Sequence, residues 1–244
     1  MDRQACNDAR CAFAIMAKAS DPGTCKTRLV PPLSYEEAAA LNTCFLGDAS
    51  ANVLAAARHR PVDGFLAYAT PDSEPFFKAN LPEGMRLLPP RAIGLGESLK
   101  QAAVDLLGFG YGGVCLINSD SPTLPTGILI DAAEILLRGN DDLVLGPSSD
   151  GGYYLIGLTR RHDRLFDEIA WSTEKVLQQT LDRAGEIGLP VTLMPEWYDV
   201  DDAASLEQLE DEFAREVTPG ELNPFPAPLT RTYLQRARAL RLAT

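Results

Sequence analysis

Histidine is scarce in this sequence, and so are the catalytic mechanisms that depend on an imidazole. His59 and His162 are the two histidines, and both stand among polar residues rather than in the apolar cleft that tunes a catalytic base. The Gly-x-Ser-x-Gly motif that presents a serine nucleophile is absent as well. Serine hydrolysis and histidine-based metal chemistry are therefore poor hypotheses for this chain.

Cysteine motifs and long apolar runs are also missing. The five cysteines are odd in number and form no Cys-x-x-Cys pair, which indicates reduced thiols rather than disulfides or a zinc–thiolate site. No stretch of about 18 apolar residues occurs, so no membrane span is expected. Residues 1–10 are polar and lack the apolar middle of a signal peptide. We therefore expect a cytoplasmic protein with a polar tail over residues 1–10.

Positive charge is in short supply. The chain has 22 Lys and Arg against 34 Asp and Glu, which gives a formal net charge of −12. Nucleic acids are not expected as partners, because their binding rests on clustered basic side chains. An acidic protein that binds phosphates must concentrate its few cations locally. A Lys/Arg pair within one loop therefore carries more weight here than it would in a basic protein.

The sequence does contain a regular alternation of short apolar runs with longer helical patterns. Strands are predicted over residues 11–17, 62–69, 86–88, 114–118, 143–146, 153–158 and 191–194. Helices are predicted after residue 34 and over residues 97–107, 125–138, 173–186 and 202–215. This order predicts one α/β domain over residues 11–218, with a mostly parallel sheet as the middle of three layers. Ligands of such sheets bind beyond the carboxyl ends of the strands.

Local signals mark the ends of several predicted helices. Ser34 and Glu37 form a capping box, the sequence pattern of a helix start. Pro125 is typical of the first turn of a helix. Asp201 or Asp202 can cap the last helix of the core.

The C-terminal part, residues 219–244, departs from the strand–helix rhythm. Residues 219–228 hold four prolines and predict an extended linker, and residues 229–242 form an arginine-rich helical segment. We favour packing of this helix on the surface of its own domain. A contact with a second copy in a homodimer is the alternative.

The first candidate site is the loop after the first predicted strand, residues 18–29. It contains Gly23, Lys26, Thr27 and Arg28. Backbone N–H groups of a glycine turn can cradle phosphates, while Lys supplies a point charge and Arg a planar fork for phosphate oxygens. A Walker loop is not favoured, because both glycines that the motif requires are missing. A solvated surface loop remains the alternative.

Two further candidates are acidic. Asp120 follows the strand predicted over residues 114–118, at the edge of the sheet where a carboxylate can hold Mg²⁺. Asp199 and Asp201 point to the same side of an extended backbone, and paired carboxylates suit a hard divalent cation. A plain Asp-Ser-Pro turn and a helix cap are the respective alternatives.

A fourth segment, residues 146–154, includes the sequence Asp150-Gly151-Gly152, which is typical of a hairpin turn. Taken alone it indicates nothing more than a turn. Trp171, a short distance further along the chain, is predicted to belong to the core.

Together these segments resemble a bacterial family of nucleotide-diphospho-sugar transferases, which is related to the phospholactate and molybdenum-cofactor guanylyltransferases. The motifs that carry the likeness are Lys18, Gly23-x-x-Lys26-Thr27-Arg28-Leu29, Gly94-x-Gly96-Glu97-Ser98-Leu99, Ser119-Asp120-Ser121-Pro122, Gly146-Pro147-x-x-Asp150-Gly151-Gly152-Tyr153-Tyr154-Leu155, Trp171-Ser172-Thr173 and Asp199-Val200-Asp201. They occur in this order over residues 12–209. Where the family continues the last motif with Thr, this chain has Asp202, which leaves the choice among the carboxylates open.

The resemblance implies a GT-A-like fold, with a Rossmann-like sheet that binds a nucleoside triphosphate (NTP) or a nucleoside-diphosphate sugar (NDP-sugar) together with Mg²⁺ or Mn²⁺. It implies catalytic roles for Lys26, Arg28 and Asp120, the first two on donor phosphates. The nucleotide-binding residues that it implies are Ala17, Lys18, Gly23, Thr27, Gly96, Ser98 and Ser119. The acceptor or sugar side would hold Asp150, Gly151, Gly152 and Tyr153. The metal ligands would be Asp120, Asp199 and Asp201.

Two enzymatic functions follow from this resemblance. A nucleotidyltransferase takes an NTP and releases pyrophosphate, whereas a glycosyltransferase takes an NDP-sugar and releases the nucleoside diphosphate. Either one would pass its group to a small-molecule acceptor that the sequence does not identify. A non-catalytic, nucleotide-binding regulatory module is the alternative from another functional class.

Overall fold

The structure, a computed structural model, describes residues 9–91, 93–216 and 222–242, with side chains described as far as residue 239. Seven strands form one sheet in the order β3-β2-β1-β4-β6-β5-β7. Their bounds are β1 Cys11–Ala17, β2 Val62–Tyr68, β3 Met85–Leu88, β4 Gly113–Ile117, β5 Leu143–Pro147, β6 Tyr153–Leu158 and β7 Val191–Leu193. These strands confirm the predicted α/β domain with its central sheet.

The sheet is parallel except at β6. β1 pairs in parallel with β2 and β4, β2 with β3, and β5 with β7. β6 runs antiparallel to both of its neighbours, β4 and β5, because a tight turn connects it directly to β5. The carboxyl ends of β1, β4 and β5 therefore open on the same edge of the sheet, which is where ligands of such folds bind.

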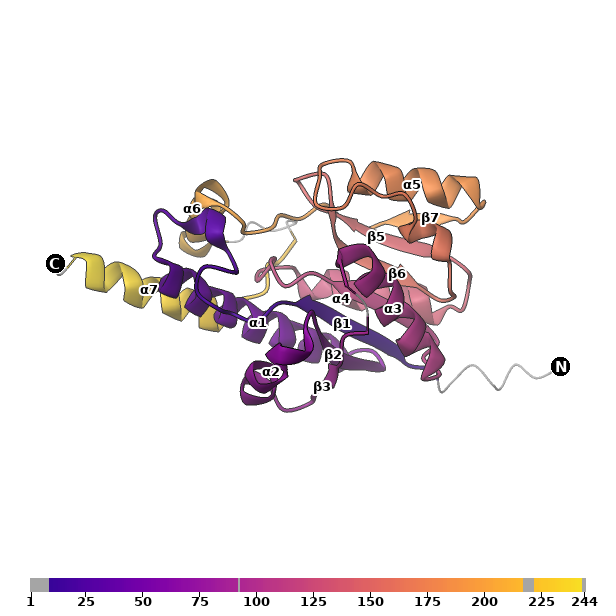
Figure 1. Ribbon diagram of the computed structural model, residues 1–244, viewed down its shortest axis with the longest axis horizontal. Helices are drawn as coiled ribbons and strands as arrows, with labels where there is room; N and C mark the ends of the chain where they lie inside the picture. The colour runs from indigo at the N-terminus through magenta and orange to yellow at the C-terminus, as the bar shows by residue number, and fades with distance from the viewer. Residues whose placement is uncertain (1–8, 92, 217–221, 243–244) are drawn as a thin grey trace.

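Helices cover both faces of the sheet (Figure 1). Their bounds are α1 Tyr35–Ala57, α2 Glu74–Asn80, α3 Leu95–Gly108, α4 Thr126–Leu137, α5 Val176–Glu186, α6 Ala203–Ala214 and α7 Pro228–Leu242. Alternate residues of β1 bury against opposite faces, as a strand covered on both sides requires. Phe13 and Ile15 pack in one core cluster with α1 and α4, while Ala12 and Ala14 pack in another with α3.

Capping residues fix where two helices begin. Ser34 accepts a hydrogen bond from the backbone N–H of Glu37, and the Glu37 side chain accepts one from the backbone N–H of Ser34, as the sequence predicts. At α6, Asp202 is the cap, and its partner is Ser205. Pro125 precedes the first turn of α4 as its N-cap instead of lying within that turn. α2 has no counterpart among the helices predicted from the sequence.

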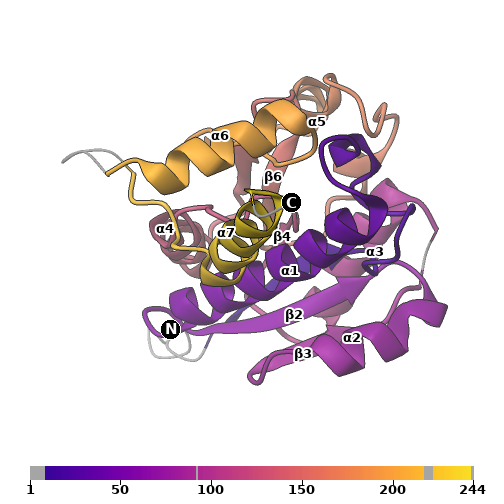
Figure 2. The same cartoon turned by 90° about the vertical axis from the view of Figure 1, so that its left-hand side faces the viewer.

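The C-terminal helix α7 packs on α1 of its own domain, which is the arrangement that the sequence analysis favoured (Figure 2). Asp48 on α1 accepts hydrogen bonds from the backbone N–H groups of Leu229 and Thr230, at 3.1 and 2.8 Å. Gly47 lies directly beneath Leu229, where a Cβ would meet the leucine side chain. Residues 222–227 of the predicted linker have no regular structure, and residues 219–221 lie outside the described residues.

A third core cluster ties these peripheral elements to the sheet edge. Leu234 of α7 packs there with Leu209 of α6, Phe45 of α1, and Leu29 and Val200 from two loops. The loops that carry Lys26 and Asp201 are therefore anchored on one apolar base. Among the helices of the described ranges, none combines the length and the apolar character that a bilayer crossing requires.

Candidate active site at the carboxyl edge of the sheet

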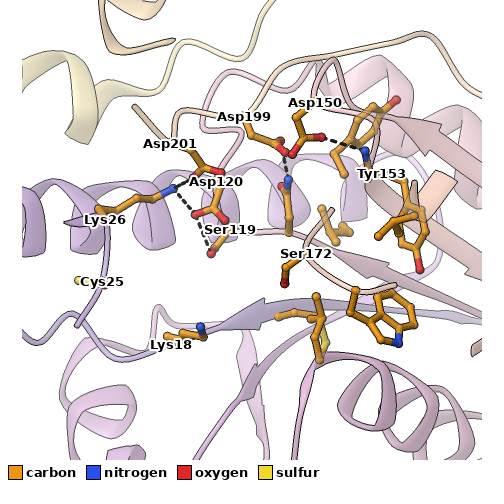
Figure 3. Close-up of a pocket in the computed structure, with 18 of the residues that line it drawn as sticks. Lys18, Cys25, Lys26, Ser119, Asp120, Asp150, Tyr153, Ser172, Asp199 and Asp201 are labelled. Carbon is orange, nitrogen blue, oxygen red and sulfur yellow. Dashed lines mark hydrogen bonds and ion pairs between the residues drawn. The ribbon is translucent and has the colours of Figure 1, made fainter. Parts of the chain in front are cut away.

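A cavity of about 690 Å³ lies at the carboxyl ends of β1 and β4 (Figure 3). Its walls come from the loop after β1, the segment after β4, the β5–β6 turn, the loop before α5 and the segment before α6. These are the stretches in which the sequence analysis placed its motifs, although Lys26 and Asp201, for example, are 175 residues apart along the chain. The fold thus brings the loop cations and the acidic residues to one cavity.

Lys26 occupies the acidic side of this cavity. Its Nζ lies 2.5 Å from Asp120 Oδ1 and 2.8 Å from Asp201 Oδ1, and it donates to the backbone oxygen of Val200 at 2.9 Å. The three protons of the ammonium therefore each have a protein acceptor. The side chain is 5% exposed and passes over the ring of Phe45, with 5.4 Å between Nζ and the ring centroid. Burial lowers the pKa of Lys26, but the charges of Asp120 and Asp201 outweigh it and hold the pKa above its ordinary value.

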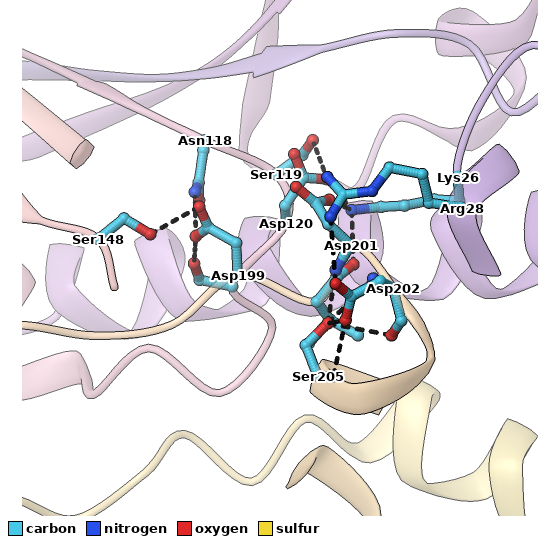
Figure 4. A network of polar contacts seen from close by, with 12 residues as sticks. Lys26, Arg28, Asn118, Ser119, Asp120, Ser148, Asp199, Asp201, Asp202 and Ser205 are labelled. Carbon is cyan, nitrogen blue, oxygen red and sulfur yellow. Dashed lines mark hydrogen bonds and ion pairs between the residues drawn. The ribbon is translucent and has the colours of Figure 1, made fainter. Parts of the chain in front are cut away.

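Asp199 is held by three polar side chains of its own (Figure 4). Its Oδ1 accepts from Asn118 Nδ2 and Ser121 Oγ, both at 2.6 Å, and its Oδ2 accepts from Ser148 Oγ at 2.8 Å. Burial and the nearby charge of Asp120 raise the pKa of Asp199 to about 6, although these three hydrogen bonds act in the opposite direction. Asp199 is half-buried and held by its hydrogen bonds, while the side chains of Asp120 and Asp201 are 33% and 38% exposed toward solvent.

The oxygens of this site fit a hard divalent cation by their chemistry. Asp120 and Asp201 present carboxylates on the cavity, and the buried Oδ1 of Asn118 has no hydrogen-bond partner. Carboxylate and amide oxygens are the ligands that Mg²⁺ and Mn²⁺ take. In the arrangement described, no group of three or more His, Cys, Asp or Glu side chains within the described ranges is placed to hold a metal, and Lys26 bridges Asp120 and Asp201 instead. The assignment of Asp120, Asp199 and Asp201 as metal ligands stays a prediction.

The remaining phosphate-loop residues divide into two groups. Lys18, Thr27 and Arg28 line the cavity, and Arg28 reaches Asp202 Oδ2 at 3.1 Å in a solvent-exposed pair. Asp202 thus both caps α6 and pairs with Arg28, which leaves Asp201 for Lys26. The described lining residues do not include Ala17, which is buried at the end of β1, or Gly23, which has a φ of 78° in the exposed turn.

Gly96 and Ser98, predicted near the base or ribose, lie on α3. A Cβ at Gly96 would overlap the indole of Trp171, so the glycine lets the tryptophan pack against the first turn of the helix. Trp171 is half-buried: it packs against the core, as predicted, and it also lines the cavity, which was not predicted. Ser98 faces a separate small hollow beside Tyr68, and the described residues that line the main cavity do not include it.

The segment predicted for the acceptor or sugar side forms the far wall. Asp150 and Gly152 line the cavity, and Asp150 Oδ1 accepts from the backbone N–H of Gly152 at 2.9 Å. Gly151, with a φ of 88°, sits against the backbone of Glu174, so the turn interlocks with the loop before α5. Tyr153 also lines the cavity, but its hydroxyl is buried away from solvent and burial raises its pKa. Tyr153 thus offers the cavity its ring rather than an accessible hydroxyl.

Three residues of the site were given no role in the sequence analysis, although Ser121 lies within one of its motifs. Asn118, Ser148 and Ser121 hold Asp199, and their positions at the ends of β4 and β5 were the signal available in the sequence. Polar side chains directly after a buried strand lie at the edge where ligands bind. Ser119, which was predicted, lines the cavity and its Oγ lies 3.4 Å from Asp120 Oδ1.

Comparison with known families places the chain in a group of bacterial proteins. The family whose description reads "Uncharacterized protein conserved in bacteria (DUF2064)" matches residues 52–173, half of the chain. The chain belongs to the DUF2064 family. The matched segment of DUF2064 contains Asp120, the Asp150 turn and Trp171, whereas the Lys26 loop and Asp199 lie outside it. No curated protein matches the sequence.

Solved structures similar to this DUF2064 chain share its fold. A provisionally named nucleotide-diphospho-sugar transferase from Desulfovibrio desulfuricans G20 is 28% identical, covers 95% of this chain and 96% of its own, and has a TM-score of 0.80. CMP:2-keto-3-deoxy-manno-octonic acid synthetase complexed with CTP is 12% identical, with coverage of 86% and 100% and a TM-score of 0.55. A 4-diphosphocytidyl-2C-methyl-D-erythritol synthase from Anaerococcus prevotii DSM 20548 is also 12% identical, with coverage of 86% and 99% and a TM-score of 0.54. The last two show the fold alone. The resemblance to the nucleotide-diphospho-sugar transferases and the GT-A-like fold expected from it are confirmed.

Proposed function

We propose that this chain is a metal-dependent transferase that uses a nucleotide-activated donor, either an NTP or an NDP-sugar. The observation that carries the proposal is the meeting of Lys26 with Asp120 and Asp201 in one cavity at the carboxyl edge of the sheet. A site that recognises donor phosphates with a divalent cation needs both cationic and acidic groups on one cavity. Lys18 and Arg28 add two further cations to the same lining.

The likeness to solved structures supports the same class of reaction. The Desulfovibrio desulfuricans protein, similar over nearly the whole chain, is named for nucleotide-diphospho-sugar transfer. The cavity of about 690 Å³ is of the size that holds a nucleotide-sized ligand, since such pockets span roughly 300–1,000 Å³. Fold and cavity are thus both compatible with a nucleotide donor.

In this proposal each group of residues has a distinct task. The oxygens of Asp120, Asp201 and Asn118 hold the cation, which when bound neutralises charge on the donor phosphates. Arg28 binds phosphate oxygens with its planar fork once it leaves Asp202, and Lys18 adds a second charge at the rim. Asp199, fixed by three hydrogen bonds, keeps Asn118 and the segment after β4 in position.

Nucleotidyl transfer and glycosyl transfer remain two versions of this proposal. A close pair of cations, Lys26 and Arg28, suits a triphosphate and favours nucleotidyl transfer. The name of the Desulfovibrio desulfuricans relative favours a sugar nucleotide. Release of pyrophosphate from an NTP, as opposed to release of a nucleoside diphosphate from an NDP-sugar, separates the two.

The test is a thermal-shift screen of NTPs and NDP-sugars with and without Mg²⁺ or Mn²⁺, followed by product analysis for any ligand that stabilises the protein. We expect stabilisation that requires both nucleotide and metal, and its loss in Asp120→Asn. The control is Asp182→Asn, which should behave as wild type. Asp182 is an exposed carboxylate on α5 that accepts a hydrogen bond from Gln178. An absence of stabilisation by any nucleotide with either metal contradicts the proposal. Tight binding with no turnover over a broad acceptor panel supports the regulatory module instead.

A further inference from the structure

Each proton of the Lys26 ammonium already has a protein acceptor, so Lys26 is not free to bind a phosphate in this arrangement. Its ammonium donates to three protein oxygens, lies among them with 5% of the side chain exposed, and passes along the face of Phe45. A lysine has three donors, so a phosphate oxygen can be bound only if one of these contacts is given up. In the arrangement described, Lys26 pairs with the acidic residues and not with the phosphates of a nucleotide.

The acidic residues in turn depend on this ammonium. Asp120 and Asp201 both approach the same nitrogen, at 2.5 and 2.8 Å. Carboxylates gathered in a partly buried place repel one another unless a cation lies between them. Lys26 supplies that cation from within the chain.

A divalent cation bound between Asp120 and Asp201 would have to lie close to Nζ of Lys26, because Nζ contacts both carboxylates. Oδ1 of each carboxylate accepts from Nζ. An ammonium and a metal ion cannot share these oxygens at such distances without strong mutual repulsion. The two cations are therefore alternatives at one position.

We propose that Lys26 is a built-in counter-ion that competes with the divalent cation for Asp120 and Asp201, so that the metal binds when the Lys26 side chain moves away. This inference rests on the proposed function, since it concerns the same site. Its consequence is that metal binding and phosphate binding are coupled. Once displaced, Lys26 is an unpaired cation at the cavity, where donor phosphates can receive it, so each ligand strengthens the binding of the other. Metal without a phosphate donor binds weakly, because the protein's own lysine must first be displaced.

The experiment measures Mn²⁺ binding by calorimetry and by electron paramagnetic resonance, on the full chain without nucleotide. Lys26→Met keeps the length and apolar stem of the side chain and removes its charge. We expect it to bind Mn²⁺ at least about tenfold more tightly than wild type, because the competing state is gone. Lys100→Met is the charge-matched control. Lys100 lies 3.7 and 3.8 Å from Asp163 and Asp167, residues that do not line the cavity in the described structure.

Two additional variants guard against misfolding of Lys26→Met and against Mn²⁺ binding at another site. Lys26→Gln retains a hydrogen-bond donor without the charge, and it should also bind Mn²⁺ more tightly if Lys26→Met fails to fold. Asp120→Asn in the Lys26→Met background should abolish the gain, which assigns the new affinity to this site.

Mn²⁺ affinity in Lys26→Met and Lys26→Gln equal to or below that of wild type overturns the inference, and so does an equal gain in Lys100→Met. These outcomes leave the proposed function standing if wild type still shows nucleotide-dependent stabilisation with Mn²⁺. Failure of that stabilisation together with a tenfold gain in Lys26→Met supports the counter-ion role and contradicts the proposed function.

Discussion

The attachment of α7 to α1 leads to a quantitative prediction about Asp48. This carboxylate is fully buried, and it caps α7 through the backbone N–H groups of Leu229 and Thr230, which lie 181 and 182 residues further along the chain. Asp48→Ala leaves both groups without their acceptor. An unsatisfied buried donor costs about 1–3 kcal/mol, and this applies in full to the Thr230 N–H, whereas the part-buried N–H of Leu229 costs less, so the gross loss is about 2–4 kcal/mol.

Removing Asp48 also removes the cost of burying its charge, and this offsets part of the loss. Burial raises the pKa of Asp48, which shows that desolvation of the carboxylate already costs the native state some stability, although the two backbone bonds act against this shift. We therefore expect a net decrease of about 2 kcal/mol in the free energy of unfolding, toward the lower end of the gross range. Asp48→Asn keeps one acceptor oxygen and should lose about half as much.

Urea denaturation at pH 7, followed by far-ultraviolet circular dichroism, measures this free energy. Asp182→Ala removes an exposed carboxylate and should change it by no more than about 0.5 kcal/mol. Hydrogen exchange at residues 229–231 gives a local readout, because loss of the cap should expose these amides first. A midpoint for Asp48→Ala that matches Asp182→Ala, with unchanged protection of α7, would refute the reasoning.

The other predictions concern the site. Gly96→Ala should displace the indole of Trp171, cost about 1–3 kcal/mol and shift tryptophan fluorescence in a Trp197→Phe background, whereas Gly127→Ala, with open space around its Cβ position on α4, should be neutral or stabilising by up to about 1 kcal/mol; equal effects of the two would contradict it. Arg28→Met should weaken nucleotide binding about tenfold yet alter the free energy of unfolding by less than about 1 kcal/mol, because its partner Asp202 is an exposed one; a large stability loss by denaturation would show a structural role instead. The pKa of Asp199 rises from 3.8 to about 6 on folding, so the native state holds the extra proton between these values and stability falls as pH rises from 4 to 6. Asp199→Asn should lack this part of the slope in metal-free urea titrations, and an unchanged slope would exclude the titration of Asp199.

Much of the sheet could be predicted because its signals are local. Buried strands appear as short apolar runs, and the capping box at Ser34 specifies the start of α1 within a few residues. α2 was missed because it is one short segment whose proline near the start reads as a breaker. The proline is compatible with the helix because the first turn has no backbone partner for its N–H. The local sequence does not show whether a helix continues beyond such a proline.

The site could be predicted in part for a related reason. Position after a buried strand marked Asp120, and the same rule applied to β5 would have marked Ser148. The pairing of Lys26 with Asp201 spans 175 residues, so its geometry depends on how α6 and the loop after β1 pack together. The expectation that Lys26 contacts phosphates came from its charge and from the family resemblance, whereas the structure shows an ammonium whose donors are all engaged within the protein.

The shared apolar base beneath the Lys26 loop also has a consequence for how the protein is made. Leu29 behind that loop belongs to the same apolar cluster as Leu209 of α6 and Leu234 of α7, so residues near one end of the chain share a core with residues near the other. During synthesis the loop emerges from the ribosome long before its support does. The cavity should therefore acquire its final shape late, when α7 settles on α1, and a nascent chain stalled ahead of Pro228 should carry the motifs without the finished site.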